Sequence, residues 1–553
     1  MNTRWLVLAA LLPTVAMAPP RKPARAGTQF SVSFPAAAHA GPITGRLIVV
    51  VSKNPTPEPR LLVSPAGPAV FAIDLDQLRP GQRATVGASA ASYPIELAEL
   101  PTGDYYVQAV IDVYTQVHRA DGHTIWVHLN DGRIETFQIA AGNLYSDVQK
   151  VHIDRSSGTT VTLDASHVIA QQPPEEDTEW VKHVRVQSQL LTKWWGRPIY
   201  VHATLLLPKG YAERPETSYP SVYTLGHGTP FQFTTKEPQN RRGVSPITGT
   251  EDGYDFYQQW VSDSMPRFIA ISFEQQTPFF PDSYSVNSAN NGPYGDAIIG
   301  EVMPALERQF RIIPKPYARI LEGASTSGWQ TLAMMLQHPD YFGGAWVLQP
   351  DPIDFRHYQQ TNIYSDTNAF AVNVGQFYSI ERPFRRTTQG QVVWTTRQLS
   401  RFENVLGSRG RSSYQLEAWE AVYGPVGEDG YPKPLWNKLT GTIDKDVASY
   451  MRDHGFDLRE YASRNWTAIG PKLVGKLHFF AGDMDDFYLN LAVYDFQDFL
   501  KSTTNPHYEA EFTFGRPMKG HSWHNWTWAG FARQAGAFVK ANTPAGESTD
   551  WNY

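Results

Sequence analysis

The stretch that most constrains the fold of this chain is ILEGASTSGW, residues 320–329. A short apolar run ends at its small residues, and a helical pattern of apolar side chains continues from them to residue 336. A buried strand, a sharp turn of small residues and a helix in direct succession are typical of a nucleophile elbow, which presents a serine at the end of the strand. We therefore expect an α/β sheet around this segment, with one of its two serines exposed on the turn.

Ser325 suits this turn better than Ser327 does. Gly323 lies two residues before Ser325 and Ser327 lies two residues after it, so the turn is flanked by small side chains. If Ser327 were the exposed serine, Trp329 would occupy the position where the helix and the strand pack most closely. Because an indole is too large for that position, the sequence predicts Ser325 as the nucleophile.

A second stretch with the same short pattern, GASAA at residues 87–91, shows that the pattern depends on its surroundings. Ser89 lies within polar alternation instead of following a buried strand, and Pro94 comes before a helix could form. We therefore exclude Ser89 and retain Ser325, which has an apolar run before it and an apolar helix after it.

The N-terminal residues, MNTRWLVLAALLPTVAMAPP, place one arginine before an apolar run and small residues after it. This layout is typical of a secretory signal peptide, and the run is too short for a membrane span. Cleavage after Ala18 is hindered by Pro19, which leaves Ala26 as a second candidate, so we assign residues 1–26 to the signal peptide. The mature protein is expected to be secreted or periplasmic, with no membrane insertion after signal removal.

The composition is that of a globular protein with more than one domain. The chain has 553 residues, of which 41% are hydrophobic and 18% are charged. Its net charge of -6 gives no electrostatic reason to expect nucleic acid as a partner. The chain contains no cysteine, which excludes disulfides, thiolate metal ligands and a lipidated cysteine.

Residues 28–170 consist of short stretches in which apolar and polar side chains alternate, separated by loops rich in proline, glycine and serine. In one such stretch Leu47, Val49 and Val51 share a face. Period-2 strands with no helical pattern between them predict an antiparallel β-sandwich of the Ig-like kind. The polar segment QQPPEEDTE, residues 171–179, then indicates a linker.

Residues 180–545 follow a different pattern, in which continuous apolar runs alternate with helical stretches. Two extended stretches, at 180–191 and 198–207, are expected to pair at the entry to a new sheet. Continuous apolar runs are typical of strands buried on both faces, so the alternation predicts a largely parallel α/β sheet. In the helical pattern that reaches Phe310, Pro304 is expected to kink or restart the helix.

Residues 351–472 form a long insertion, with at least two amphipathic helices that end before Gly407 and Gly424. An insertion at this point of an α/β sheet is expected to cover the strand ends as a cap. It contains a cluster of seven arginines: Arg382, Arg385, Arg386, Arg397, Arg401, Arg409 and Arg411. Two interpretations are open, because such arginines can pair with acidic side chains elsewhere or line a pocket that binds an anionic ester.

A serine nucleophile needs a base, and the base needs an acid that orients it. In α/β-hydrolases the acid follows the serine in the chain, after a later strand. The apolar run KLHFFA is followed by GDMDDF, in which Asp485 is the candidate acid and Asp483 and Asp486 are the alternatives.

The histidine is expected after the next strand. The strand-like run EFTF is followed by KGHSWHNW, in which His521 lies in a loop that begins with glycine. His524 is the competing candidate in the same loop. Because His521 comes third in the order serine, acid, histidine, we predict that it is the base.

An oxyanion formed at Ser325 needs two preorganised N–H donors. One donor is expected from the backbone of Thr326, at the start of the helix. The other is expected from the loop after an early strand, VYTLGHGTPF, where we predict the backbone N–H of Thr229. His227 in the same loop is predicted to shape the turn.

Together these motifs resemble the putative esterase family, which includes esterase D and enterochelin-esterase-like hydrolases. The resemblance covers roughly residues 180–540 and is carried by LLLPKGY, YPSVYTLGHG, GASTSG, AGDMDD and GHSWHNW. It implies an α/β-hydrolase catalytic domain with a triad of Ser325, Asp485 and His521. The segment ahead of it resembles N-terminal domains attached to some members. The family usually has glycine where this chain has Ser327.

The leading interpretation is a secreted serine esterase that hydrolyses carboxylic esters through an acyl-enzyme. Its substrate is expected to be a small-molecule or glycan-linked ester, and acylated carbohydrates, aryl esters and siderophore-like esters all suit an exported hydrolase. No metal or organic cofactor is implied. Two alternatives are an acyltransferase with the same triad and a non-catalytic ligand-binding protein on a hydrolase fold, and the ordered triad argues against the second.

Overall fold

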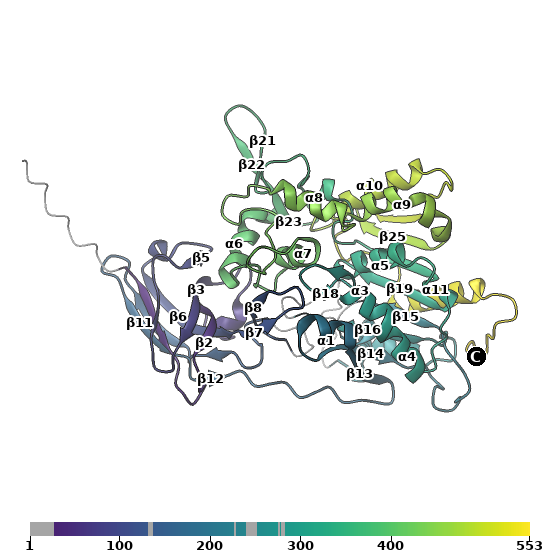
Figure 1. The fold of residues 1–553 in the computed structure, drawn as a ribbon, viewed down its shortest axis with the longest axis horizontal. Helices are drawn as coiled ribbons and strands as arrows, with labels where there is room; N and C mark the ends of the chain where they lie inside the picture. The colour runs from purple at the N-terminus through teal and green to yellow at the C-terminus, as the bar shows by residue number, and fades with distance from the viewer. Residues whose placement is uncertain (1–26, 131–135, 226–227, 239–250, 275–276, 278–281) are drawn as a thin grey trace, which may run out of the picture.

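The computed structural model describes residues 27–130, 136–225, 228–238, 251–274, 277 and 282–553. A β-rich N-terminal part and a larger α/β part lie side by side, with helices of the insertion between them (Figure 1). The predicted signal peptide, residues 1–26, lies outside the described residues. Among the helices that the structure describes, none is both long and apolar enough to cross a membrane.

The α/β part is built on one sheet, to which the described residues contribute eight strands. Their order across the sheet is β13 (Val181–Ser188), β14 (Ile199–Leu206), β16 (Ile269–Glu274), β15 (Ser221–Thr224), β19 (Arg319–Ala324), β20 (Gly344–Leu348), β25 (Leu477–Gly482) and β26 (Glu511–Gly515). The chain order is thus interrupted at one place, where β15 and β16 are exchanged.

Strand directions complete this topology. β14 runs antiparallel to both of its neighbours, and the other pairs are parallel. The extended stretches expected to pair at the entry to the sheet do so, as β13 and β14. An eight-stranded sheet with this order, a single antiparallel strand and helices on its faces is an α/β-hydrolase domain, as the sequence predicts.

Helices cover both faces of the sheet (Figure 1). They are α1 (Gln189–Trp195), α2 (Gly253–Trp260), α3 (Tyr294–Ala297), α4 (Met303–Gln309), α5 (Thr326–Gln337), α9 (Leu458–Leu473), α10 (Asn490–Ser502) and α11 (Trp528–Asn542). Every residue of β20 and β25 is buried as a result. This burial on two faces explains why their sequences are continuous apolar runs.

Pro304 does not break the helix that contains it. α3 continues into α4 through a π-helical turn at Ile298–Val302, immediately before the proline. Proline has no N–H to donate to the carbonyl four residues earlier, and its ring crowds that carbonyl. A wider turn at this point accommodates the missing hydrogen bond, so the predicted kink appears as a local change of helical type.

In the N-terminal part, two of the sheets that the structure describes share one core. One has the order β11 (Thr160–Asp164), β1 (Gln29–Ser33), β4 (Ala84–Val86). The other has the order β12 (His167–Val168), β9 (Leu144–Tyr145), β6 (Gly103–Val113), β2 (Ile43–Ser52), β3 (Ala69–Leu78), β5 (Ala91–Tyr93), with β10 (Gln149–Ile153) also paired to β6. Phe30 and Leu163 of the first sheet share an apolar core with Leu47 and Val107 of the second.

The first and last long strands of this part pair in parallel, β1 with β11. The alternating pattern predicts antiparallel strands, which is wrong for this pair. Strands joined by a hairpin must be antiparallel, but β1 and β11 come from opposite ends of the segment and carry no such constraint.

The second face of β2 is also buried, whereas the alternating pattern predicts one buried and one exposed face. Ile48 and Val50 point away from the shared core and are nevertheless fully buried. They belong to the core that continues into the insertion, where α6 (Thr396–Leu406) lies against β3 and β5. Tyr93 of β5 and Phe402 of α6 meet edge to face, with ring centroids 5.3 Å apart.

Arg46 of β2 fastens the N-terminal part to the end of α6. Its guanidinium donates to the carbonyl oxygens of Asn404 (3.1 Å) and Val405 (2.9 Å), and it pairs with Asp74 at 2.9 Å. Arg46 is 4% exposed. The carbonyls at a helix C-terminus lack partners within the helix, and a cation there is also favoured by the helix dipole.

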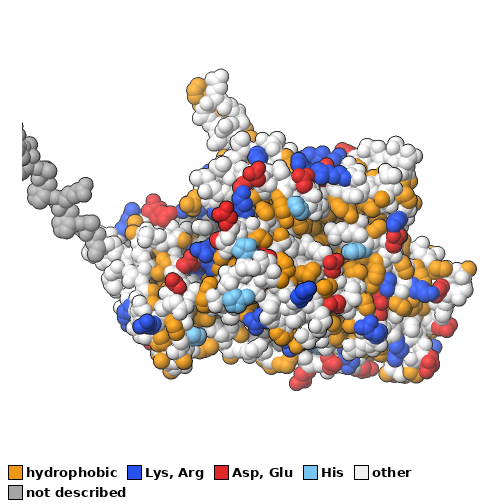
Figure 2. Space-filling model, viewed as in Figure 1, with side chains coloured by type: hydrophobic (Ala, Val, Ile, Leu, Met, Phe, Trp, Pro, Cys, Tyr) orange, Lys and Arg blue, Asp and Glu red, His pale blue; other side chains and the backbone are white. Residues whose placement is uncertain are grey.

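The insertion holds further elements, which its loops connect. They are α7 (Gln415–Tyr423), α8 (Lys445–Asp453), and the hairpins β21 (Ala371–Asn373) with β22 (Ser379–Glu381) and β23 (Pro383–Arg386) with β24 (Val392–Thr395). α6 and α7 end at the predicted glycines, Gly407 and Gly424. The hairpin β21–β22 projects from the molecule, with Phe377 93% exposed at its tip (Figures 1 and 2).

Two short hairpins and one helix lie where the parts of the chain meet. β7 (Thr115–His118) and β8 (Thr124–Val127) reach from the N-terminal part to pack on α1 and α7, and β17 (Asn287–Ser288) pairs with β18 (Gly292–Pro293). Helix α9 lies within the predicted insertion 351–472 but packs against α5 and belongs to the layer that covers the sheet.

The Arg46 contact predicts a measurable loss of stability. Arg46→Ala would remove the donor from the buried carbonyl oxygen of Val405 and the partly buried one of Asn404, so we expect a destabilisation of about 2–4 kcal/mol. Differential scanning calorimetry would detect this as a lower melting temperature. The control is Arg155→Ala, because Arg155 is exposed in the same part of the chain. Equal melting temperatures for the two variants would contradict the role of Arg46.

Candidate active site

Ser325 occupies the turn between β19 and α5. Its backbone has φ 60° and ψ −121°, a conformation that non-glycine residues rarely adopt. Three backbone hydrogen bonds hold it there: its N–H donates to Leu348 (3.1 Å), and its carbonyl accepts from Trp329 (3.1 Å) and Asp351 (3.0 Å). The side chain at such a turn projects from the end of the strand, as a nucleophile must.

Small residues around Ser325 are required by backbone contacts. A Cβ atom at Gly323 would lie 2.4 Å from the carbonyl oxygen of Ser327, and one at Gly328 would lie 2.6 Å from that of Leu348. Ser327 itself is 5% exposed and donates its hydroxyl to the carbonyl of Leu225, at the end of β15. This geometry favours Ser325 as the nucleophile, because the Ser327 hydroxyl is engaged and buried.

Asp485 and His521 meet at the ends of β25 and β26. Asp485 is fully buried, and its Oδ2 accepts a hydrogen bond from Nδ1 of His521 at 2.7 Å. Its Oδ1 accepts from the backbone N–H groups of Phe487 (2.9 Å) and Leu489 (3.1 Å). These donors stabilise the carboxylate, and the carboxylate fixes the tautomer in which Nδ1 carries a proton and Nε2 is free to accept one.

The environment of His521 favours its protonated form. Burial acts against the charge, but the charge and hydrogen bond of Asp485, with further contributions from Asp351 and Asp486, raise the pKa of His521 above its usual value. An imidazole that gains a proton during a reaction is stabilised by such an arrangement.

The alternative acids and the competing histidine have other contacts. Asp483 accepts from the backbone N–H of Lys519 (2.9 Å), and Asp486 accepts from that of His521 (3.2 Å), so both hold the loop that carries His521. His524 lies against Trp526, with ring centroids 5.1 Å apart. Among these candidates, Asp485 and His521 are the pair that the fold brings together.

A further carboxylate, Asp351, lies beside Ser325. The Ser325 hydroxyl donates to its Oδ1 at 3.4 Å, which is a long hydrogen bond. Its Oδ2 is surrounded by four donors, whose distances are 2.8 Å for Tyr284 Oη, 2.9 Å for Trp419 Nε1, 3.1 Å for Gln415 Nε2 and 3.2 Å for Thr326 Oγ1. Burial raises the pKa of Asp351, while the hydrogen bonds from Trp419 and Tyr284 and the charge of His521 oppose this effect.

Sequence reasoning placed Asp351 at the start of the insertion and gave it no role. The available signal was its position, because the residues QPDP directly follow a buried strand that neighbours the elbow strand. Side chains at the carboxyl ends of adjacent parallel strands lie close together, so an acid there was a candidate for the site.

The two predicted oxyanion donors lie on different kinds of element, one on a helix and one in a loop. Thr326 is the first residue of α5, whose N-terminal N–H groups have no partners within the helix. Thr229 precedes the short turn Pro230–Gln232, in the loop after β15. His227 lies outside the described residues.

A cavity of about 260 Å³ opens onto Ser325 and Asp351. Its lining residues come from the N-terminal part, the α/β part and the insertion, and most of them are apolar or aromatic. The other residues that line it are Pro65, Gln359, Phe384, Trp394, Leu399, Tyr414, Gln415, Trp419, Phe487 and Leu489. We call it the Ser325 pocket. Pro65 is supplied by the N-terminal part, and residues 384–419 by the insertion.

The arginine cluster has no member among the described residues of the Ser325 pocket. Its side chains contact acidic residues or carbonyl oxygens, in the pairs Arg382–Asp366, Arg385–Asp486, Arg386–Asp485 carbonyl, Arg397–Glu381, Arg401–Glu96, Arg409–Asp429 and Arg411–Asp74. The structure therefore supports the pairing interpretation, in which these arginines bind groups of the chain itself.

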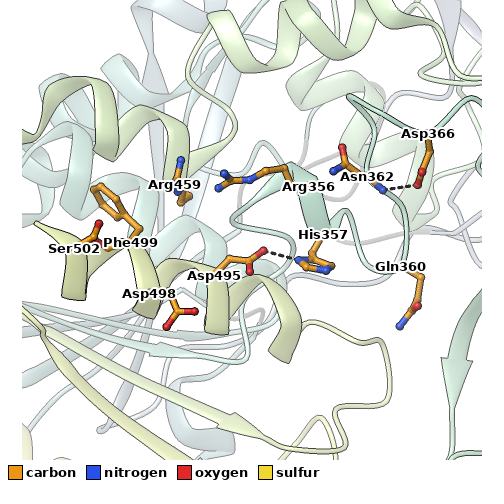
Figure 3. Close-up of a pocket in the computed structure, with 10 residues that line it drawn as sticks. All are labelled: Arg356, His357, Gln360, Asn362, Asp366, Arg459, Asp495, Asp498, Phe499 and Ser502. Carbon is orange, nitrogen blue, oxygen red and sulfur yellow. Dashed lines mark hydrogen bonds and ion pairs between the residues drawn. The ribbon is translucent and has the colours of Figure 1, made fainter.

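A larger cavity, of about 530 Å³, lies between α10 and the start of the insertion (Figure 3). Its lining is charged, and it includes the pair formed by His357 Nδ1 and Asp495. It shares no lining residue with the Ser325 pocket and is separate from it. In the part of the chain that the structure describes, no group of three or more His, Asp or Glu side chains is arranged to hold a metal ion.

Solved structures of several esterases resemble this chain. An S-formylglutathione hydrolase from Staphylococcus aureus is 14% identical with a TM-score of 0.32, covering 65% of this chain and 99% of its own. A ferulic acid esterase from Anaeromyces mucronatus is 14% identical with a TM-score of 0.30 (67% and 95%), and an S-formylglutathione hydrolase from Agrobacterium tumefaciens is 11% identical with a TM-score of 0.32 (66% and 96%).

At these identities and TM-scores, the assignment to a family rests on sequence instead. No curated protein sequence matches the chain. The sequence model of the family described as "Putative esterase" matches residues 200–534, which is more than half of the chain and spans the elbow, Asp485 and His521. The chain therefore belongs to the putative esterase family and is a carboxylic ester hydrolase.

Proposed function

We propose that this esterase is an exported serine hydrolase whose triad is Ser325, His521 and Asp485. The observation that carries the proposal is the 2.7 Å hydrogen bond between Asp485 and His521, next to a serine on a strained strand–helix turn. A buried acid, an oriented imidazole and an exposed hydroxyl in this order form the arrangement that activates a serine.

The chemistry proceeds in two halves. Oγ of Ser325 attacks the ester carbonyl carbon while its proton passes to Nε2 of His521. The tetrahedral oxyanion then collapses, the ester C–O bond breaks, and His521 returns the proton to the departing alcohol. A water molecule attacks the acyl-enzyme in the same way, giving its proton to His521, which passes it to Ser325 as the carboxylic acid is released.

Ser325 must change its hydrogen bond before it reacts. Among the described residues, its hydroxyl is bonded to Asp351 and not to His521. The mechanism requires rotation about its side-chain bond to bring Oγ to Nε2, and such catalytic hydrogen bonds often tighten only when substrate is present. We assign the backbone N–H groups of Thr326 and Thr229 to the oxyanion, since two preorganised donors are needed there.

The proposal also covers the three segments that precede the catalytic domain. Residues 1–26 have the layout of a signal peptide, so we propose a secreted or periplasmic enzyme. We also propose that residues 28–170 form an Ig-like β-sandwich domain and that residues 171–179 link it to the catalytic domain, because its two sheets share one core. N-terminal sequencing of the exported protein tests the first of these statements.

The serine assignment predicts a large difference between two variants. Ser325→Ala should lose activity on the order of a millionfold, as in a serine protease that lacks its nucleophile. Ser327→Ala should lose far less, because its hydroxyl holds the carbonyl of Leu225 and does not react. Hydrolysis of p-nitrophenyl acetate measures both, and a sugar acceptor added to the same assay distinguishes hydrolysis from acyl transfer. The reverse order of the two losses would place the elbow at Ser327.

The acid assignment predicts that Asp485→Asn lowers kcat by about 10⁴-fold, because asparagine stabilises the wrong imidazole tautomer. Asp483→Asn is the matched control, since Asp483 bonds only the backbone of the neighbouring loop among the contacts described. If Asp483→Asn were the more damaging change, the acid would have to be reassigned.

The pH dependence follows from the raised pKa of His521. The imidazole must be neutral to accept a proton, so kcat/KM should fall as the pH drops through this pKa. Asp486→Asn removes one of the charges that raise the pKa, so the acid limb of the profile should move to lower pH. Asp498→Asn, in the separate larger cavity, should leave the limb in place. A shift to higher pH in Asp486→Asn would contradict this electrostatic account.

A further inference from the structure

The Ser325 pocket combines an apolar wall with one acidic group. Aromatic rings of Phe384, Trp394, Tyr414, Trp419 and Phe487 line it, and among its described lining residues none is lysine, arginine or histidine. Asp351 is the one carboxylate in this lining. A pocket of this kind holds an apolar side chain well and repels an anionic one.

The two oxygens of Asp351 have different surroundings. Oδ2 receives hydrogen bonds from Tyr284, Trp419, Gln415 and Thr326, which fill its acceptor capacity. Oδ1 receives only the long 3.4 Å contact from the Ser325 hydroxyl among the hydrogen bonds described. When Ser325 turns toward His521, Oδ1 is left facing the reaction centre with its acceptor sites free.

A buried carboxylate without a cation is costly, and the neutral donors around Oδ2 offset only part of that cost. Among the described groups whose charge acts on it, the one that can become positive is His521, which is already bonded to Asp485 and must be neutral to act as the base. A positively charged substrate group would supply the missing partner.

The position of Oδ1 restricts where that group can be. Once Oγ of Ser325 approaches the carbonyl carbon of an ester, a substituent on the adjacent α-carbon lies two bonds farther away. Oδ1 is 3.4 Å from Oγ in the conformation described. Once Oγ has turned toward His521, the space beside Oδ1 is open to an N–H on that substituent, which can form a hydrogen bond of ordinary length, about 3 Å. A group at the far end of the acyl chain would instead lie deep in the aromatic pocket.

We propose that the Ser325 pocket selects esters of α-amino acids with apolar side chains, and that Asp351 Oδ1 binds their α-ammonium group. The inference rests on the proposed function, because it uses Ser325 as the nucleophile. The aromatic wall holds the side chain, and the carboxylate orients the acyl group by a charge-assisted hydrogen bond.

Three methyl esters with one carbon skeleton test the proposal. They are those of L-phenylalanine, L-phenyllactic acid and 3-phenylpropionic acid, which carry an α-ammonium, an α-hydroxyl and an α-hydrogen. We expect kcat/KM for the phenylalanine ester to exceed that for the phenylpropionate ester by about 10- to 100-fold, as a hydrogen bond to a charged group implies. The phenyllactate ester should fall between them. Chromatography of the released acid measures all three rates.

Asp351→Asn provides the second measurement. Asparagine keeps the size of the side chain and one acceptor oxygen but removes the charge, so the ratio of the phenylalanine ester to the phenylpropionate ester should drop to a few-fold or less. The ratio is the readout because it cancels a general loss of activity in this variant. Asp498→Asn removes a carboxylate from the separate larger cavity and should keep the wild-type ratio.

The outcomes separate the two proposals. Equal rates for the three esters, an equal rate for the phenyllactate and phenylalanine esters, or an unchanged ratio in Asp351→Asn would each overturn the role of Asp351 and leave the esterase proposal standing. Hydrolysis of p-nitrophenyl acetate without hydrolysis of any of the three methyl esters would overturn the substrate class. Failure to hydrolyse p-nitrophenyl acetate as well would overturn the proposed function itself.

Discussion

The strained backbone of Ser325 is the constraint on which the site depends. A residue with φ 60° and ψ −121° is unfavourable by itself and persists only where surrounding contacts determine it. Here those contacts come from β20 and the residues after it, through the carbonyl of Leu348 and the N–H of Asp351. The hydrogen bond from Asp351 that holds the carbonyl of Ser325 therefore also fixes the backbone of Asp351 next to Ser325.

The shape of the site is set by parts of the chain that are far apart in sequence. The insertion supplies most of the aromatic wall, and the N-terminal part contributes Pro65. The hydroxyl of Tyr93, whose ring packs against Phe402 of α6, donates to the carbonyl of Pro65 at 2.5 Å. Arg46 joins the same two parts at the C-terminus of α6, within one turn of Phe402. The position of the pocket wall is thus coupled to contacts that lie outside the catalytic domain.

The elements that sequence could predict are those with a strong local signature. The strand, the small residues and the helix around Ser325 lie in one continuous stretch, and Asp485 and His521 follow strands of recognisable apolar character. The hydrolase sheet follows from the same runs. The partners of the arginines were less predictable. Arg401 and Arg411 are close in sequence to other arginines but pair with Glu96 and Asp74 of the N-terminal part.

Long-range packing explains the other differences between the predicted and the observed structure. The alternation around Leu47 indicated one buried face, but the insertion covers Ile48 and Val50 on the other. Parallel pairing of β1 with β11 joins strands whose order in the chain gives no hint of it. The position of Asp351 after a buried strand is a weak signal, because its donors come from Tyr284, Gln415 and Trp419, which only the folded chain brings to it.

Asp485 and Asp351, the two carboxylates of the candidate site, differ in what stabilises them, and this difference separates their proposed roles. Asp485 is held by backbone N–H groups, which cannot move without unfolding the loop, and it is bonded to His521. Asp351 is held on one oxygen by side chains, and among the described contacts its other oxygen meets only the hydroxyl of Ser325. In the proposed mechanism, Asp485 therefore orients His521 throughout the reaction, whereas Asp351 presents an acceptor oxygen once Ser325 turns toward His521. Because Asp485 already binds His521, the proposal leaves Asp351 to bind a group that the substrate carries on the carbon next to its carbonyl.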